Sequence, residues 1–460
     1  MNKYLLFFFL VWLVGCSKAD KNPKNIFFAG EIVNPTSSHI VLFNGDKVID
    51  SARLDDQNRF SFTLDSLQQG LYHFSHAPEF QYVYLEQGDS LMVRLNTADF
   101  DESLVFSGKG EEINNFLLEL FLANEEEAPY IDSYFVLEAK QFAQKIDSLK
   151  QAKHDLLAEL FAEGSVTSKE RSIANASIDY NYNTFKEIYP FKHKRLLHNG
   201  KMEALPADFY DYRKAIDFGN QNFTYLRPYY TFMLNHIQNL SYMDCSMDCT
   251  KEDMGIKNQL HFNEHKMQLI DSLIVEKELK DNLFRYVAFD YLLHVHDSEE
   301  NIGAFIKTFH DLSKNNRHID EIDNLFNGIE NIQPSKSIPN IYVSNVDGDT
   351  ISLRDISKNG KTVFYFWSGN EKMHFEKVSE RVASLSAAKP DYKFVGINIR
   401  TSEGMWKNML EMSELDKENQ FRAVNFESLT NALIINKLNK CVITDKGQIV
   451  DAFSDIYSAF

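Results

Sequence analysis

Five consecutive large apolar residues, Val363-Phe-Tyr-Phe-Trp367, limit the architectures open to this chain of 460 residues. A run without a polar interruption predicts a strand that is covered on both faces, as in the centre of a parallel sheet. An amphipathic helix is expected from Phe375 to Ala388, and a second buried strand follows over Tyr392–Ile399. This alternation of strand and helix predicts a parallel α/β core with right-handed crossovers.

The residues around this core extend the pattern over 334–460. A strand is expected over Ile338–Val343, and Cys441–Val450 is expected to form a hairpin that turns at Asp445-Lys-Gly447. The order of these pieces resembles the membrane-anchored thioredoxin-like family, which includes cytochrome-maturation reductases and peroxiredoxin relatives. The resemblance implies a thioredoxin-like domain over 334–460. The matching residues are Pro339, Asp347-Gly348, Ser352-Leu353, Gly360-Lys361, Phe366-Trp367 and the Asp-x-Gly-x-Ile-Val hairpin.

The positions of this family's redox residues hold other side chains here. When Phe366-Trp367 is aligned with the family, the two cysteines of its Cys-x-x-Cys fall at Glu371 and His374. The family's cis-proline position falls near Leu438 or Asn439, where the chain has no proline. Thiol–disulfide exchange needs a thiolate and a second, resolving thiol. The resemblance therefore implies a degenerate redox site.

Two interpretations of Glu371 and His374 stay open. Either they are substitutions without function, or they belong to a cleft that has been repurposed for binding. A Glu-x-x-His pair on one helical turn can ligate a metal only with partners from other elements, and a carboxylate at a helix N-terminus is favourable with the dipole alone. We expect neither a metal nor a cofactor here.

The first 25 residues predict export and a lipid anchor. Lys3 precedes an apolar run from Tyr4 to Val14, which is typical of a signal peptide over 1–15 and is too short to span a membrane. Leu13-Val-Gly-Cys16 resembles the lipobox of bacterial lipoproteins. The resemblance implies that Cys16 is lipidated, with palmitate among its acyl chains, and that 16–25 form a tether. The alternative is an ordinary signal peptide with a chance cysteine.

Residues 26–110 predict an all-β sandwich. Short strands alternate between apolar and polar residues, as in Arg59–Leu64, Phe80–Leu85 and Ser90–Leu95, with turn residues between them. The stretch resembles a β domain of unknown function that precedes the thioredoxin-like domain in many bacterial lipoproteins. The matching features are Gly30-Glu-Ile32, Asp56-Gln-Asn-Arg-Phe60, Gly70-Leu-Tyr72 and Leu85-x-x-Gly-Asp89.

Residues 111–333 predict a helical region. Apolar residues from Phe135 to Leu160 recur at three, four or seven positions, which predicts one helix capped at its start by Asp132 or Ser133. Aromatic residues crowd the stretches Tyr180–Phe185 and Tyr225–Phe232. Aromatics at such spacing favour a helix–helix core, and a ligand-facing surface is the alternative.

The remaining cysteines leave two functions to distinguish. Cys245 and Cys249 are four residues apart, which permits a local disulfide or two free thiols, whereas Cys441 is expected in the core of a strand. The first hypothesis is a non-catalytic envelope lipoprotein, at the periplasmic or surface face of the outer membrane, that binds a peptide or protein partner. The second is a thiol-disulfide oxidoreductase that uses these non-standard cysteines. The net charge of −18 argues against nucleic acid as a partner.

Overall fold

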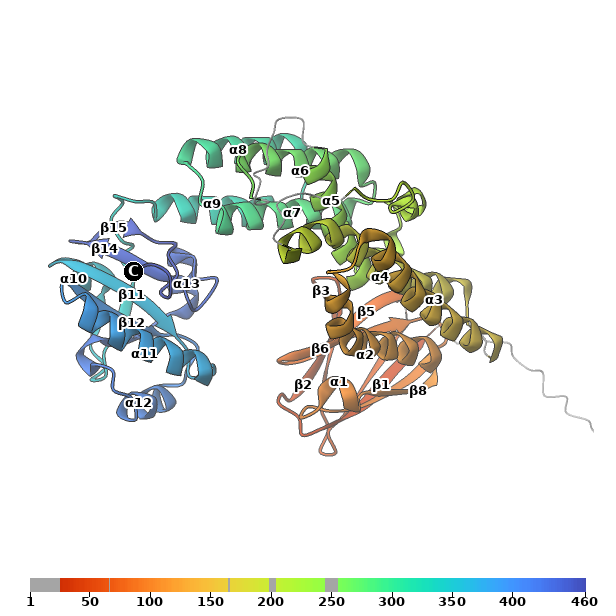
Figure 1. The fold of residues 1–460 in the computed structure, drawn as a ribbon. Helices are drawn as coiled ribbons and strands as arrows, with labels where there is room; N and C mark the ends of the chain where they lie inside the picture. Colours follow the sequence, from red (N-terminus) through yellow and green to blue (C-terminus); the bar gives the residue numbers. More distant parts are fainter. Residues whose placement is uncertain (1–24, 66, 164–165, 198–203, 245–254) are drawn as a thin grey trace, which may run out of the picture. The chain divides into compact units, whose positions relative to one another are not determined.

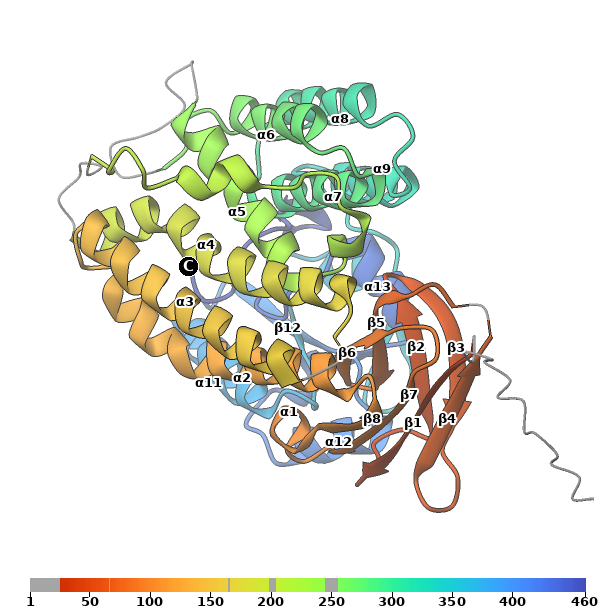
Figure 2. The same ribbon diagram turned by 90° about the vertical axis from the view of Figure 1, so that its right-hand side faces the viewer.

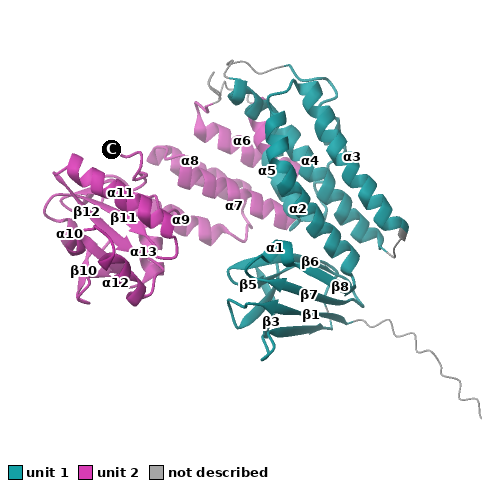
Figure 3. Ribbon diagram, turned by 60° about the horizontal axis from the view of Figure 1, so that its bottom comes forward, with its two compact units in different colours: residues 1–236 teal, residues 237–460 magenta. Residues whose placement is uncertain are grey.

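A computed structural model describes residues 25–65, 67–163, 166–197, 204–244 and 255–460 (Figure 1). The chain divides into two compact units, residues 1–236 and residues 237–460 (Figure 3). The helical region expected over 111–333 is therefore shared between two bodies. Cys16, Cys245 and Cys249 lie outside the described residues, so their predicted lipidation and pairing stay predictions.

The N-terminal β region consists of two four-stranded sheets, in the order β4-β1-β7-β8 and β3-β2-β5-β6. Alternating side chains such as Phe60 and Phe62 on β4 point inward and form the core with the facing sheet. β1 pairs in parallel with β7 and antiparallel with β4. The strands are β1 (Ile26–Val33), β2 (His39–Asn44), β3 (Lys47–Arg53), β4 (Arg59–Leu64), β5 (Gly70–His76), β6 (Glu79–Leu85), β7 (Ser90–Asn96) and β8 (Val105–Lys109), with the short helix α1 (Phe100–Ser103) before β8.

Helices α2, α3 and α4 pack side by side in the first unit (Figure 2). The predicted start of one helix at Asp132 or Ser133 was wrong, because both residues belong to the last turn of α2. The chain turns after Tyr134 and resumes as a helix at Ala139. Phe135, in the turn, packs on Phe142 with ring centroids 5.0 Å apart, so it continues the apolar stripe without being helical. The helices are α2 (Glu111–Tyr134), α3 (Ala139–Glu163), α4 (Ser168–Leu197) and α5 (Arg227–Met243), with the 3-10 turns η1 (Asp211–Ala215) and η2 (Gln221–Phe223) before α5.

The second unit joins a group of helices to an α/β domain. Its helices begin with favourable caps: Asn258, Glu276 and Ser298 each accept a backbone N–H bond at the start of the helix that follows. The helices are α6 (Gln259–Leu273), α7 (Lys277–His294), α8 (Glu299–Leu312) and α9 (Ile319–Asn331). Within the described ranges, no helix is both long and apolar enough to cross a membrane.

The α/β domain has a seven-stranded sheet in the order β10-β9-β13-β12-β11-β14-β15. β11 pairs in parallel with β12 and antiparallel with β14, and every residue of β11 except Lys361 is buried. A parallel βαβ unit followed by an antiparallel hairpin on the same central strand is the thioredoxin-like arrangement. The predicted multidomain fold class is confirmed. The elements are β9 (Tyr342–Ser344), β10 (Thr350–Ser352), α10 (Leu353–Ser357), β11 (Lys361–Trp367), α11 (Lys372–Ala388), β12 (Tyr392–Asn398), α12 (Glu403–Glu411), η3 (Lys417–Asn419), β13 (Gln420–Ala423), α13 (Phe426–Leu433), β14 (Cys441–Asp445) and β15 (Gln448–Asp451).

Candidate functional site

The loop between β11 and α11 occupies the place of the thioredoxin active site. Glu371 is the N-cap residue of α11 and His374 is the third residue of that helix. Phe375 donates its backbone N–H to the Glu371 carbonyl at 3.0 Å, which closes the first turn. The Glu371 side chain is exposed and caps no backbone group. The structure thus places both predicted positions together on the first turn of one helix.

This loop is hydrogen-bonded to the segment that follows β12. The Gly369 N–H donates to the Thr401 hydroxyl at 2.7 Å, and the Asn370 side chain donates to the Arg400 carbonyl at 3.0 Å. A Cβ atom on Gly369 would lie 2.7 Å from Cγ2 of Thr401 and 2.8 Å from Sδ of Met409. Only glycine therefore fits at this position without displacing its neighbours.

His374 is half-buried, and its ring nitrogens lack hydrogen-bond partners among the described residues. Both ring nitrogens are covered, and neither meets hydrogen-bond geometry with any described residue. Burial lowers the pKa of His374, while the charge of Glu371 and the side chain of Asn439 oppose that shift. The ring is therefore neutral at physiological pH. Asn439 comes from the loop before β14.

Cys441 is sealed inside the sheet. Cys441 is 0% exposed and pairs with Tyr365 where β14 lies antiparallel to β11. Burial, together with the charges of Asp451 and Asp455, raises the pKa of its thiol to about 12. A thiol in this environment is protonated at neutral pH and cannot act as a nucleophile. The prediction that Cys441 is a core residue agrees with this burial.

Sequence reasoning missed the neighbour of Cys441. Lys440 is only 4% exposed, its Nζ donates to the Ile434 carbonyl at 2.8 Å, and it lies 4.5 Å from the centre of the Phe453 ring. Burial lowers the pKa of Lys440 to about 7. A single lysine in a polar loop gives no sequence signal of such burial, because the covering residues come from other elements.

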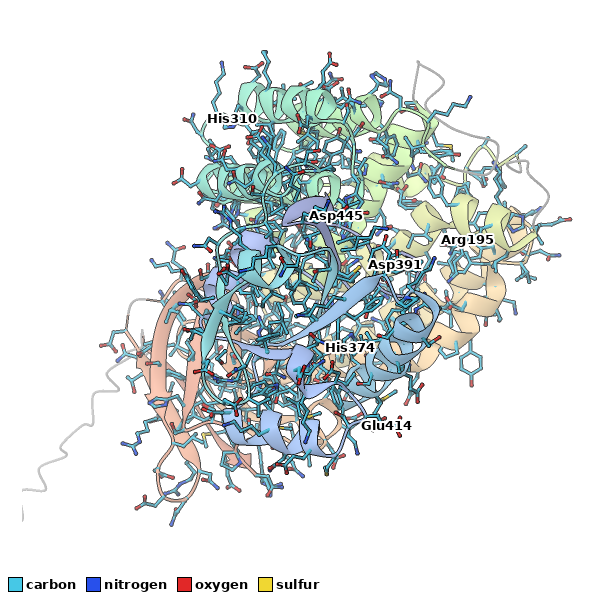
Figure 4. The ribbon with its side chains drawn as sticks, turned by 90° about the vertical axis from the view of Figure 1, so that its left-hand side faces the viewer. Arg195, His310, His374, Asp391, Glu414 and Asp445 are labelled. Atoms are coloured by element: carbon cyan, nitrogen blue, oxygen red, sulfur yellow. The ribbon has the colours of Figure 1, made fainter. Side chains whose placement is uncertain are left out.

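A groove runs between α11 and α12 beside the loop that holds Glu371 and His374. It has a volume of about 550 Å³ and begins at Gly369. Met405, Met409 and Met412 line one wall, and Phe375 and Ala383 belong to the other. Lys372, Glu376, Glu380 and Glu414 supply the charged groups of its lining. Figure 4 labels His374 and Glu414 in this domain. The lining is therefore apolar and adaptable, with an excess of acidic groups.

No group of three or more potential metal-binding side chains occurs among the described residues. Glu371 and His374 accordingly find no third ligand there.

Comparisons with known proteins give likenesses to thioredoxin-like structures. The chain is similar to a putative thiol-disulfide oxidoreductase from Bacteroides vulgatus, at 17% identity over 28% of this chain and 92% of that one, with a TM-score of 0.25. A thioredoxin-like protein from Bacteroides caccae matches at 12% identity over 58% of this chain and 91% of its own length, with a TM-score of 0.34. A pneumococcal exposed lipoprotein thioredoxin from Streptococcus pneumoniae matches at 20% identity over 25% and 87%, with a TM-score of 0.21. No family model and no curated protein matches this sequence. The sheet order of the second unit, rather than these scores, defines its fold.

Proposed function

We propose that the thioredoxin-like domain is a redox-inactive module that binds an extended peptide segment of a partner protein. The observation that carries this proposal is the methionine-lined groove of about 550 Å³ beside a loop that holds Glu371 and His374 in place of two cysteines. The groove offers contact area, whereas the loop offers no thiolate.

The lining of the groove favours a particular kind of segment. Methionine side chains are flexible and polarizable, so they adapt to apolar partners of different shape. Glu380 and Glu414 make no ion pair within the described part of the chain. Nζ of Lys372 lies 3.9 Å from Oε1 of Glu376, so these two charges are paired. The unpaired carboxylates favour a segment with apolar residues in its centre and basic residues beside them.

The proposal includes a location for this module. An exported protein anchored by an acylated Cys16 would present the groove in the cell envelope, where extended segments of other envelope proteins are accessible. Metabolic labelling with a palmitate analogue tests this part: we expect incorporation into the wild-type protein and none into Cys16→Ser. Equal labelling of both proteins would refute the anchor.

Disulfide reductase activity separates this function from the oxidoreductase alternative. We expect the chain from residue 17 to 460 to show no turnover in an insulin-reduction assay, because Cys441 is buried and protonated and Cys245 and Cys249 do not form a Cys-x-x-Cys pair. Turnover that disappears in Cys441→Ser or in Cys245→Ser would overturn the proposal.

Site-specific photo-crosslinking tests the groove itself. A photoreactive residue at Met412, which is 82% exposed in the groove, should crosslink to a synthetic peptide that has an apolar centre and lysines at both ends. The matched position is Met373, which is 70% exposed but does not line the groove. Ala383→Arg should abolish the crosslink by filling the groove, and Ser384→Arg on the same helix should not. Equal crosslinking from Met412 and Met373 would refute groove binding.

A further inference from the structure

An apolar cavity of about 460 Å³ lies within the first unit, where α2, α4 and the start of α5 meet the β region. Its size falls in the range of about 300–1,000 Å³ that is typical of small-molecule sites. Leu71 and Phe106 come from the β region, Phe121 comes from α2, and Phe185 and Ile188 come from α4. These side chains form apolar walls, so a ligand that fills them must be largely apolar.

Three polar side chains of the lining already have hydrogen-bond partners in the fold. Asn114 bonds to the backbone of Tyr84 and Gly110, while the hydroxyls of Ser177 and Thr184 donate to carbonyls one turn earlier on α4. These side chains are therefore hydrogen-bonded within the protein and do not require a ligand as a partner.

Two amide side chains in the cavity lining behave differently. Oδ1 of Asn124 on α2 and Nδ2 of Asn181 on α4 are buried and have no hydrogen-bond partner among the described residues. A buried polar atom without a partner destabilises the fold, and such atoms are rare in native proteins. The unsatisfied atoms are one acceptor and one donor. A peptide group, which carries one N–H and one C=O, complements that pair.

Charges of both signs accompany these amides in the lining. Arg227, the first residue of α5, makes no ion pair and no hydrogen bond within the described ranges. Its charge lowers the pKa of the Tyr82 hydroxyl against the raising effect of burial, so it lies near that wall. Glu125 on α2 is the acidic counterpart, and Asp101 nearby adds a second carboxylate. A carboxylate on the ligand suits Arg227, and an ammonium group suits Glu125.

We propose that the Asn124–Asn181 cavity binds a short apolar peptide with free termini. Its peptide group would satisfy the two amides, its side chains would fill the apolar walls, and its carboxylate and ammonium groups would meet Arg227 and Glu125. In this proposal the aromatic stretches around Asn181 and Arg227 contribute both to a helix–helix core and to a ligand-facing surface. Tyr180, Tyr182, Tyr229 and Phe232 are core, while residues between them line the cavity.

Calorimetric titration of the full chain, kept free of detergent, with the dipeptide Leu-Phe tests this proposal. We expect saturable binding that weakens about twofold to fivefold when both termini are capped, or in Arg227→Gln, because each step removes a charge pairing at an exposed residue. Absence of saturable binding would overturn the proposal. Binding of dodecanoate but not of Leu-Phe would also overturn it, since the site would then take fatty acids.

The two amides have a sharper test. Asn124→Leu/Asn181→Leu should weaken Leu-Phe binding about tenfold or more, while the melting temperature of the unliganded protein stays equal or rises, because two unsatisfied polar groups are removed. Asn175→Leu, a half-buried change on α4 outside the cavity lining, is the matched control and should leave binding unchanged. A drop in melting temperature, or unchanged binding, would show that the amides are structural and would refute the site.

The cavity test is independent of the groove in the thioredoxin-like domain. Ala383→Arg should leave Leu-Phe binding unchanged, since Ala383 belongs to the other unit. If Ala383→Arg removed that binding, the peptide would occupy the groove, and the cavity proposal would fail while the groove proposal stood.

Discussion

Glu187 on α4 is the centre of a buried charge network, and its replacement by glutamine should destabilise the first unit strongly. The side chain is 0% exposed and accepts hydrogen bonds from Arg213 at 3.0 and 2.5 Å, from Tyr212 at 3.0 Å and from His236 at 2.8 Å. Glu187→Gln keeps the shape but removes the charge, and it turns an amide N–H₂ group toward donors. Removing one partner of a buried ion pair costs about 3–5 kcal/mol.

Differential scanning calorimetry of the full chain measures this loss. For a unit of this size, 1 kcal/mol corresponds to about 2–4 °C, so the transition of the first unit should fall by about 6–20 °C. The control is Asp132→Asn, which removes the exposed ion pair between Asp132 on α2 and Lys192 on α4 and should cost at most about 1 kcal/mol. If Glu187→Gln changed the transition no more than Asp132→Asn does, the reasoning about the buried network would be wrong.

The acid side of the stability curve gives a second readout of the same network. Burial alone would raise the pKa of Glu187, but the hydrogen bonds and charges of His236 and Arg213 outweigh it and lower the pKa. A carboxyl with a lowered folded-state pKa stabilises the fold above its unfolded pKa, about 4.3, and the stabilisation is lost as the pH falls through the folded value. The wild-type unit should therefore lose stability below about pH 4.3 more steeply than Glu187→Gln does.

Three further predictions concern the thioredoxin-like domain. Glu371→Cys/His374→Cys should form a disulfide that dithiothreitol reduces, because both residues lie on the first turn of α11. Thiol titration measures this. If the pair stayed reduced under oxidising conditions, the alignment of Glu371 and His374 with the family's two cysteines would be contradicted. Burial lowers the pKa of Lys440 to about 7, below its unfolded value of about 10.4. The stability of the second unit should therefore rise with pH between these two values. Urea unfolding measures this, and an equal rise in Lys440→Met would show that Lys440 is not the cause. Cys441 should resist iodoacetamide in the folded protein and react after unfolding, as peptide mass spectrometry can show, whereas rapid labelling of the native chain would contradict its burial.

The central strand and its helix were predictable because their pattern is local. An unbroken apolar run identified β11, the alternating strands identified most of the β region, and the predicted hairpin after Cys441 corresponds to β14 and β15. The strand expected over Ile338–Val343 illustrates the limit: only Tyr342–Ser344 pairs as β9. The rest of that segment is extended or turning chain, and its environment depends on elements far along the sequence.

The sequence by itself predicted the order of strands and helices and the core character of Cys441, because each depends on residue type and periodicity. The absence of the family's two cysteines at Glu371 and His374 rests on the resemblance and stays a prediction. Only the tertiary structure decided the candidate binding sites. The groove needs α11 and α12 together, and the cavity needs α2, α4 and α5 around Asn124 and Asn181, each of which has one buried amide atom without a partner among the described residues. The physical reason is that burial and hydrogen-bond satisfaction are properties of neighbours in space. Oδ1 of Asn124 and Nδ2 of Asn181, like the side chain of the buried Lys440, belong to ordinary polar residues, and only the fold removes these atoms from water.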